Sequence, residues 1–248
     1  MSKQIISVIG SGRSGTHLLG YVLETSNKVT ASIEDGELFP KITKAATRND
    51  KTSIKEISAI LSERLEGCST DIYLEKSHPL LWFANDSLIS SLPIKFIGIR
   101  RDPFATVSSM LVHNGVRKWC EQWKSLPQPN IFLGTRIDSI EEYSSMSIAQ
   151  KCTMRWISHT KELERLRYLL SPDQYQLICY EDLISSSNKT IKVIEGFVGI
   201  KDIDKNFKFN SESLHKWKTE ISPEQTREIA EVLNKHYKDS EGEAGYKV

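Results

Sequence analysis

The stretch QIISVIGSGRSGTHLLGYVLE, residues 4–24, constrains the fold more than any other part of the chain. Its apolar, β-branched start predicts a buried strand over Ile5–Ile9, and the amphipathic run at its end predicts a helix over Thr16–Thr25. The glycine-rich loop between them gathers backbone N–H groups at the positive end of the helix dipole, which favours binding of a phosphate group. Nucleoside triphosphatases carry a lysine directly after the last glycine of such a loop, whereas this chain has Thr16 there.

The loop and the first helical turn contain the candidate phosphate ligands. The glycines allow a tight turn, and the hydroxyl, imidazole and guanidinium groups add side-chain donors. These candidates are Gly12, Arg13, Ser14, Gly15, Thr16 and His17. A purely structural strand-to-helix turn is the alternative interpretation. A dinucleotide-binding loop is disfavoured because no acidic residue ends a second strand at the required distance.

The rest of the chain alternates short β-branched runs with longer amphipathic stretches, which is typical of parallel strands joined by crossover helices. We therefore expect one domain, residues 1–248, with three α/β/α layers around a central, mainly parallel sheet. The segment 114–147 has weak periodicity and predicts a substrate-side insertion that forms a loop or lid. Further strands are predicted at Ile72–Lys76, Ile94–Ile99 and Gln176–Cys179, and further helices at Ser53–Leu65, Phe104–His113, Ile148–Leu170, Lys189–Val198 and Pro223–Tyr237.

Composition excludes several classes of protein. The net charge of +1 argues against a nucleic-acid surface. The four cysteines are widely spaced and form no CxxC pair, so we interpret them as reduced thiols of an intracellular protein, without a bound metal. The absence of a leader-like start and of an apolar run of about 20 residues predicts a cytoplasmic protein without an integral membrane segment.

Besides the glycine loop, three candidate sites lie at the ends of predicted strands, and two of them contain charged side chains. Arg101 ends one strand and Ser109 lies about two turns along the next helix, which would clamp a second phosphate unless the arginine merely pairs with Asp102. Lys76 and His78 are two residues apart in extended chain and point the same way, so the lysine would keep the imidazole neutral. His78 before a proline is also compatible with a structural turn.

A fourth candidate is Tyr180, which closes the last predicted strand. Its ring and hydroxyl would contact a base or ribose, or else pack in the core with a polar tip.

In this order, these motifs resemble the sulfotransferases that use 3′-phosphoadenosine 5′-phosphosulfate (PAPS). GRSGTHLL is similar to that family's 5′-phosphosulfate loop, with His17 in place of a threonine. IRRDPFATVSSML resembles its 3′-phosphate motif, which implies that Arg101 and Ser109 hold the ribose phosphate. YEDL, followed by I-x-x-I-x-x-F-V-G, implies that Tyr180 lies near the adenosine. WK ahead of SPE, and the closing AGYKV, resemble the C-terminal segment of the bacterial and tyrosylprotein branches.

The resemblance covers nearly the whole chain except residues 114–147 and much of 41–68, and it implies a P-loop NTPase-like sulfotransferase fold. It also explains the missing lysine, because PAPS carries one phosphosulfate and a separate ribose phosphate, with 3′,5′-ADP as the product. Arg13 and Arg101 would divide the positive charge between these two groups. No metal is expected to be needed.

Sulfuryl transfer requires stabilisation of the leaving oxygen and removal of a proton from the acceptor. We assign the first task to Arg13 and Lys76. For the second, His78 is similar to the base of the cytosolic branch, and Glu34 occupies about the position of the catalytic glutamate in the tyrosylprotein branch. We favour Glu34, with His78 as the alternative.

The acceptor and two rival functions stay open at this point. Trp119 and Trp123 in the insertion are candidate acceptor contacts, or else members of a small local core. A small metabolite, a glycan or a lipid-linked hydroxyl (or an amine) is expected as the acceptor. The rivals are a P-loop kinase or other phosphotransferase, which would need a lysine near Thr16 and a strand-terminal aspartate for Mg²⁺, and a non-catalytic nucleotide-binding protein.

Overall fold

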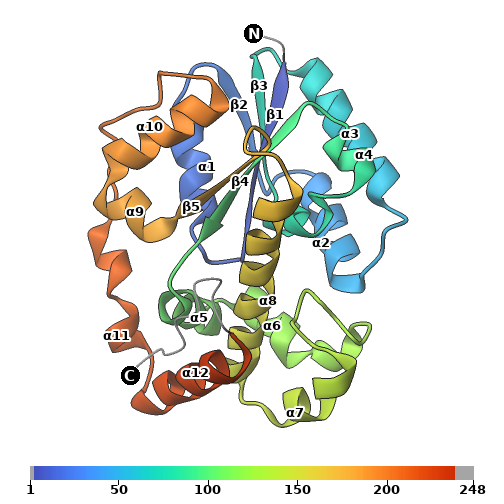
Figure 1. Cartoon of the computed structure of the whole chain (residues 1–248), viewed down its shortest axis with the longest axis vertical. Coiled ribbons are helices and arrows are strands. Elements are labelled where there is room, and N and C mark those ends of the chain that lie inside the picture. The colour runs from blue at the N-terminus through green and yellow to red at the C-terminus, as the bar shows by residue number, and fades with distance from the viewer. Residues whose placement is uncertain (1–2, 238–248) are drawn as a thin grey trace.

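The computed structural model describes residues 3–237 (Figure 1). Within this range, five parallel strands form one sheet in the order β2-β3-β1-β4-β5. Ile5 of β1 pairs with Tyr73 of β3 on one side and with Ile94 of β4 on the other. Together with the flanking helices, this sheet confirms the predicted three-layer α/β/α fold. The strands are β1 Gln4–Gly10, β2 Val29–Ile33, β3 Ile72–Lys76, β4 Ile94–Arg100 and β5 Tyr175–Cys179.

The position of β1 in the sheet explains where a ligand can bind. The chain runs from central β1 to edge strand β2, returns through β3, and then continues on the other side of β1 with β4 and β5. In open parallel sheets, ligands bind beyond the carboxyl ends of the strands where the strand order reverses. The loop after β1 and the ends of β3 and β4 meet at this point.

The helices cover both faces of the sheet and extend beyond its carboxyl end (Figure 1). The α-helices are α1 Thr16–Glu24, α2 Leu38–Arg48, α3 Ile54–Gly67, α4 Ser87–Ser90, α5 Pro103–Val112, α6 Asn114–Glu121, α7 Ile140–Ser145, α8 Ile148–Leu169, α9 Tyr180–Ser185, α10 Ser187–Val198, α11 Trp217–Glu220 and α12 Pro223–His236. Short 3₁₀ turns are η1 His78–Phe83, η2 Trp123–Ser125, η3 Ile137–Ser139 and η4 Ser211–Leu214. Within residues 3–237, none of the helices has the length and apolar character needed to cross a membrane.

Side chains alternate between two cores, one on each face of the sheet. Ile6 and Val8 of β1 pack with α1 and α10, whereas Ile5 and Ile9 face the larger core that contains α3, α5 and α8. Because both faces are covered, the strand residues that face the two cores are mostly apolar, as expected for a parallel sheet. This burial fixes the strand ends, and with them the positions of the polar residues that follow.

Capping explains where two of the long helices begin. Ser147 and Gln150 form a reciprocal capping box at the start of α8, and Ser222 and Gln225 form another at α12. Pro223 occupies the first turn of α12, which confirms the predicted start of that helix. The closing AGYKV lies outside the described residues.

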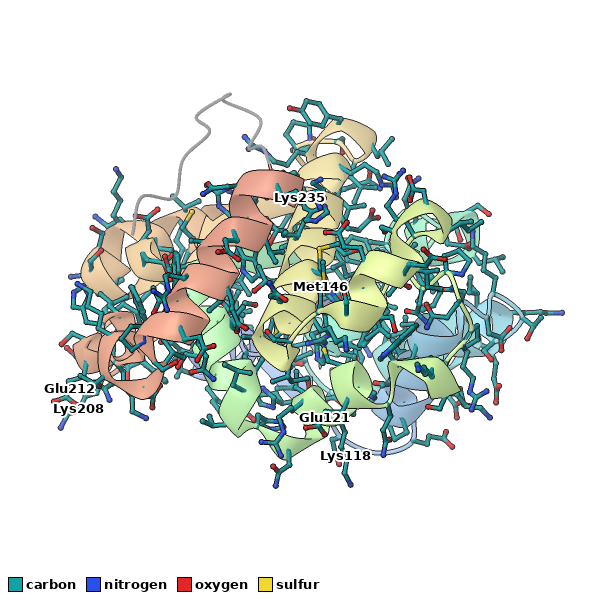
Figure 2. All side chains as sticks on the ribbon, turned by 90° about the horizontal axis from the view of Figure 1, so that it is seen from below. Lys118, Glu121, Met146, Lys208, Glu212 and Lys235 are labelled. Atoms are coloured by element: carbon teal, nitrogen blue, oxygen red, sulfur yellow. The ribbon has the colours of Figure 1, made fainter. Side chains whose placement is uncertain are left out.

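Several elements were not predicted. Edge strand β2 and the helices α2, α4, α9 and α11 have no counterpart among the predicted elements. The segment 114–147, predicted to form a loop or lid, contains the helices α6 and α7, and its place on the substrate side stays a prediction. Figure 2 shows the segment 114–147 and α12 on either side of α8, with Lys118 and Glu121 of α6 at the outer edge of the segment. The aromatic rings of the segment meet edge to face in two pairs, Trp119 with Phe132 and Trp123 with Tyr143.

Candidate active site

The glycine loop after β1 has an unusual backbone that fits its sequence. Arg13 and Gly15 both have positive φ, 76° and 96°. A Cβ on Gly15 would lie 2.3 Å from Cδ2 of Tyr180, so only glycine fits both the backbone and the space. The hydroxyl of Ser14 donates to the carbonyls of Ser11 (2.7 Å) and Ile99 (3.1 Å). Ser14 therefore braces the loop from inside, and the loop leads directly into α1.

The predicted 3′-phosphate residues lie together beside this loop. Arg13 Nε donates to Ser109 Oγ (3.0 Å), and Arg101 Nη1 donates to the carbonyl of Arg13 (3.4 Å). The guanidinium of Arg101 stacks 4.3 Å from the ring centroid of Tyr180. Ser213 of η4 joins the group, since its carbonyl accepts from Arg101 (2.5 Å) and its hydroxyl lies 2.7 Å from the Tyr180 hydroxyl. Sequence reasoning missed Ser213, which has no motif signal.

Two like charges approach each other in this group. Partial burial, and then the charge of Arg101, lower the pKa of Arg13. Arg101 Nε is buried and has no hydrogen-bond partner among residues 3–237. Two adjacent guanidinium groups with spare donors favour an anion between them.

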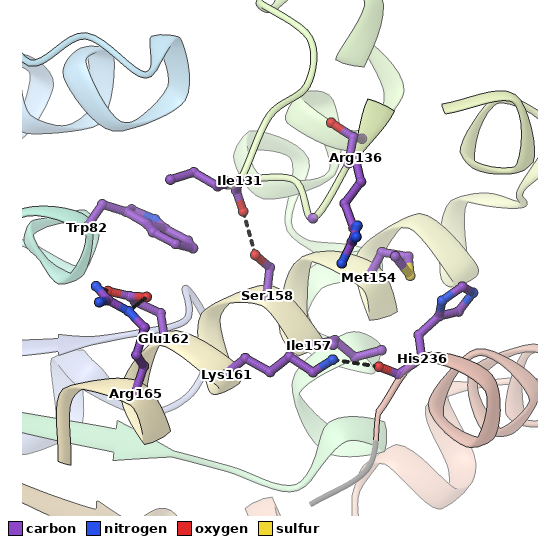
Figure 3. A pocket seen from close by; sticks show the side chains of 12 residues that line it. Trp82, Ile131, Arg136, Met154, Ile157, Ser158, Lys161, Glu162, Arg165 and His236 are labelled. Atoms are coloured by element: carbon purple, nitrogen blue, oxygen red, sulfur yellow. Dashed lines mark hydrogen bonds and ion pairs between the residues drawn. The ribbon is translucent and has the colours of Figure 1, made fainter. Parts of the chain in front are cut away.

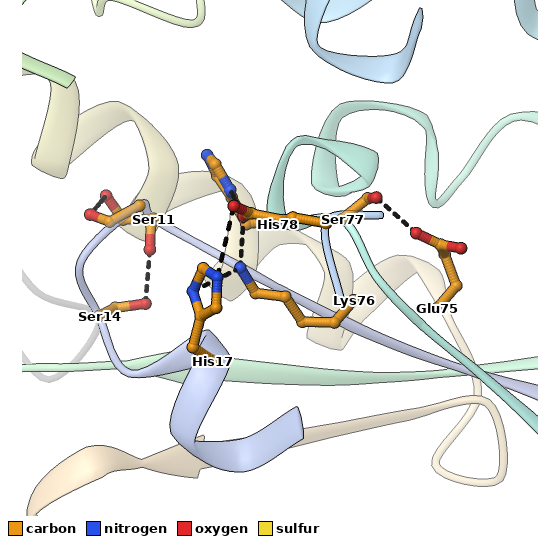
Figure 4. A network of polar contacts seen from close by, with 9 residues as sticks. Ser11, Ser14, His17, Glu75, Lys76, Ser77 and His78 are labelled. Carbon is orange, nitrogen blue, oxygen red and sulfur yellow. Dashed lines mark hydrogen bonds and ion pairs between the residues drawn. The ribbon is translucent and has the colours of Figure 1, made fainter. Parts of the chain in front are cut away.

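A second cluster surrounds Glu34, at the residue after β2, and Figure 4 shows His17, Lys76 and His78 of this cluster. Glu34 Oε1 accepts from the Lys76 ammonium and lies 2.8 Å from Nδ1 of His78. Its Oε2 lies 3.5 Å from Nε2 of His17, and Nδ1 of His17 lies 2.9 Å from Nζ of Lys76. Glu34 has a positive φ of 52°, a costly conformation that recurs at functional sites. The two alternative bases, Glu34 and His78, are thus hydrogen-bonded partners.

Burial and mutual contacts set the protonation of the cluster. Partial burial raises the pKa of Glu34, but the hydrogen bond and charge of His78, followed by Lys76, outweigh it and bring this pKa to about 2. Burial lowers the pKa of His78 to about 4, against the opposing hydrogen bond to Glu34. At neutral pH the carboxylate is therefore ionised, and a neutral His78 donates its Nδ1–H to Glu34.

Lys76 is nearly inaccessible but keeps most of its charge at neutral pH. Burial lowers its pKa to about 8, and the neighbouring carboxylate of Glu34 opposes this shift. Burial, and then the charge of Lys76, lower the pKa of His17, so that its Nδ1 accepts from the ammonium. His17, which stands in place of a threonine, therefore contacts the Lys76–Glu34 pair.

The free edge of His78 faces the glycine loop. Its Nε2 is buried, has no hydrogen-bond partner within the described residues, and lies 3.3 Å from where a Cβ on Gly12 would be. With the proton on Nδ1, this nitrogen has a lone pair directed toward the loop. A neutral imidazole in this orientation is suited to accept a proton beside the glycine loop.

The two tryptophans of the segment 114–147 take different positions. Trp123 is buried against Tyr143, and Trp119 is partly buried against Phe132. Both contribute to the local core, and their contact with an acceptor stays a prediction. Helix α8 brings a residue that sequence reasoning missed: Arg155 lies 5.2 Å from the Trp119 ring centroid.

A separate hollow of about 430 Å³ lies along α8, away from these residues (Figure 3). Its lining includes Trp82, Arg136, Lys161 and His236 and contains none of the predicted site residues. Arg165 at its edge is bound by Glu162 on the same helix. This hollow therefore has its own set of residues and does not contribute to the loop site.

Comparisons with known proteins identify the family of this chain. Three similar solved structures are a sulfotransferase domain from the curacin biosynthetic pathway (TM-score 0.57, 16% identity, 94% of this chain and 98% of that chain), one from a Synechococcus olefin synthase (0.55, 17%, 94% and 96%), and a mouse sulfotransferase complexed with PAP (0.54, 16%, 97% and 87%). At such identities the likeness shows the fold. No curated protein matches the chain significantly. The sulfotransferase domain family matches residues 4–213, and the chain therefore belongs to the sulfotransferase family.

Proposed function

We propose that the protein transfers the sulfuryl group of PAPS to a hydroxyl or amine of an acceptor. The observation that carries this proposal is the position of Nε2 of His78 beside Gly12 of the phosphate-binding loop. A proton acceptor and an anion-binding loop thus share one space, which transfer to a hydroxyl requires.

The residues present fit a ligand with two separate anionic groups. The loop N–H groups and Arg13 suit one of them at the N-terminus of α1. Arg101 and Ser109 suit the other, because the spare Nε of Arg101 and the hydroxyl beside Arg13 are donors next to the loop. Tyr180 lies between Arg101 and Gly15 and would contact the nucleoside. PAPS has this pair of groups, whereas ATP carries its phosphates in a single chain.

PAPS supplies the sulfuryl group and a good leaving group, 3′,5′-ADP. His78 accepts the acceptor's proton at Nε2 as the new O–S or N–S bond forms and the S–O bond to the 5′-phosphate breaks. Glu34 holds His78 by its Nδ1–H and stabilises the imidazolium that results. Lys76 and Arg13 provide positive charge for the leaving oxygen. This assignment gives the base to His78, in place of the sequence-based preference for Glu34.

The low pKa of Glu34 supports this division of roles. A carboxylate with a pKa of about 2 and contacts to three cationic or donor groups is a weak base. It is, however, well suited to orient an imidazole. The acceptor itself is proposed as a small metabolite, a glycan or a lipid-linked group.

A thermal-shift comparison tests the donor. We expect 3′,5′-ADP to raise the melting temperature and ATP–Mg²⁺ to leave it nearly unchanged, because a ligand that binds only the native state stabilises it by mass action. AMP serves as the control without a 3′-phosphate. Stabilisation by ATP–Mg²⁺ without stabilisation by 3′,5′-ADP would contradict the proposal and favour a phosphotransferase.

A further inference from the structure

Arg155 of α8 is a fully buried charge without an anionic partner. Its exposed fraction is 0%, and its Nε and Nη2 have no hydrogen-bond partner among residues 3–237. Nη1 meets only the sulfur of Met110, at 3.8 Å, in the described structure. An unpaired buried guanidinium is costly to a fold, so its presence requires an explanation.

The guanidinium lies directly against Gly12 of the phosphate-binding loop. A Cβ on Gly12 would lie 3.4 Å from Nη2 and 3.6 Å from Nη1 of Arg155, and 3.3 Å from Nε2 of His78. The spare donors of Arg155 and the free nitrogen of His78 therefore face the same point. A ligand atom that approaches Gly12 would contact both.

The surroundings of Arg155 hold the guanidinium but do not neutralise it. Phe132 and Trp119 lie 4.6 and 5.2 Å from its central carbon, and their rings interact with the guanidinium as a cation. The titratable groups that interact with Arg155 are the thiols of Cys120 and Cys152, the phenol of Tyr143 and the imidazoles of His78 and His159, and none of these is a carboxylate. The edge of the guanidinium that points toward Gly12 thus keeps unused N–H donors.

We propose that Arg155 is an oxyanion-binding residue on the acceptor side of the loop. This inference rests on the proposed function and adds to it a residue that binds a negatively charged group next to the reacting atoms. The oxyanion has two possible sources: the sulfuryl group in transfer, or an acidic group of the acceptor, such as a carboxylate, held close to the hydroxyl that reacts. In either case the guanidinium donates at least one N–H from its unpaired edge.

The test compares R155M and R155K with the wild type, and uses R165M as the matched control. Arg165 lies on the same helix but is already paired with Glu162. Its replacement therefore removes a positive charge from α8 without changing the donors beside Gly12. Met replaces a buried charge by an apolar chain of similar length, and we expect R155M to melt at the wild-type temperature or above it. R155K keeps the charge and provides a second variant if R155M does not fold.

Two titrations by thermal shift or calorimetry give the result. In the first, sodium sulfate is added to protein saturated with 3′,5′-ADP, against sodium chloride of equal ionic strength. In the second, affinities for PAPS and for 3′,5′-ADP are compared. Loss of a charge-assisted hydrogen bond is expected to weaken binding by about tenfold or more. R165M should behave as wild type, and R155K should fall between.

The two sources give different patterns. If Arg155 binds the sulfuryl group, R155M weakens PAPS about tenfold and leaves 3′,5′-ADP unchanged. If it binds an acidic acceptor, R155M loses sulfate affinity and keeps both nucleotide affinities. Equal behaviour of R155M and wild type in both titrations overturns the proposal. Failure of 3′,5′-ADP to bind the wild type would instead count against the proposed function, and titration with sulfate alone would still test Arg155.

Discussion

The pairing of Glu34 with His78 makes a quantitative prediction for the variant E34Q. Glutamine keeps an oxygen for the Nδ1–H of His78 but removes the negative charge. The 2.8 Å contact joins an ionised acceptor to a ring that gains positive charge as it takes the proton. Such a bond contributes about 1.5–3 kcal/mol, and about 1.4 kcal/mol corresponds to tenfold in rate. We therefore expect kcat to fall about 10- to 100-fold.

H78A should cost more, because removal of a general base lowers the rate by about 10²–10⁴-fold. The assay is the initial rate of 3′,5′-ADP release from PAPS, with water as the acceptor where no other is at hand. E37Q is the matched control, since Glu37 is exposed and lies outside the cluster around Glu34. We expect it to match the wild type.

The pH profile separates the two bases. With His78 as the base, activity rises as pH passes about 4 and falls as Lys76 loses its proton near pH 8. In E34Q both limbs move to lower pH, because the carboxylate raises the pKa of both groups. A loss in E34Q at least as large as that in H78A, with the limb near pH 4 still present in H78A, would refute His78 as the base.

Three further outcomes are expected. R101A should weaken 3′,5′-ADP binding about 10- to 100-fold and leave AMP unchanged, as measured by calorimetry; equal losses for both ligands would place Arg101 away from the 3′-phosphate. G15A should unfold roughly 2–4 kcal/mol more easily in urea, because its φ is 96° and its new methyl group meets Tyr180. G196A is the control, because its new methyl group meets no atom within 4 Å, and this variant should be stabilised by about 0.5–1 kcal/mol. A G15A variant as stable as the wild type would contradict the described backbone and contact of Gly15. Because the pKa of His78 is about 4 when folded and 6.5 ordinarily, wild type should lose about 3 kcal/mol of stability as pH falls from 6.5 to 4, and H78Q should lack this loss.

The layers of the fold were predictable from the sequence, but its edge was not. The buried strands have long β-branched runs, whereas β2, with the sequence VTASI, is short, lies at the edge of the sheet and has exposed Thr30. The alternation of apolar and polar residues in β2 is too short and too weak to predict a strand from the sequence. Helix α2 was not predicted because it contains Pro40, and a proline usually indicates the end of a helix. Pro40 lies in the first turn, where a proline is tolerated.

The same gap explains why Glu34 and His78 appeared as rivals. Their contact depends on the parallel pairing of β2 with β3, which brings the N–H of Glu34 to the carbonyl of Lys76 at 3.0 Å. Without β2, no sequence argument places these residues side by side. The sequence gives a weak indication that Arg155 is buried, because it lies on the same face of the predicted helix as Cys152 and His159, which are buried. A charge at such a core position indicates an internal role.

The aromatic pairs of the segment 114–147 have a consequence for how this enzyme can change. Trp119 packs on Phe132 and Trp123 packs on Tyr143 within the segment, and the rings of Trp119 and Phe132 also lie over Arg155 of α8. The residues proposed to bind the donor lie instead at the strand ends of the sheet. We therefore expect substitutions within the segment 114–147 to change the preferred acceptor more than the affinity for 3′,5′-ADP. Under the proposed function, such a chain could acquire a new acceptor while it keeps its donor, with Arg155 at the junction of the two parts.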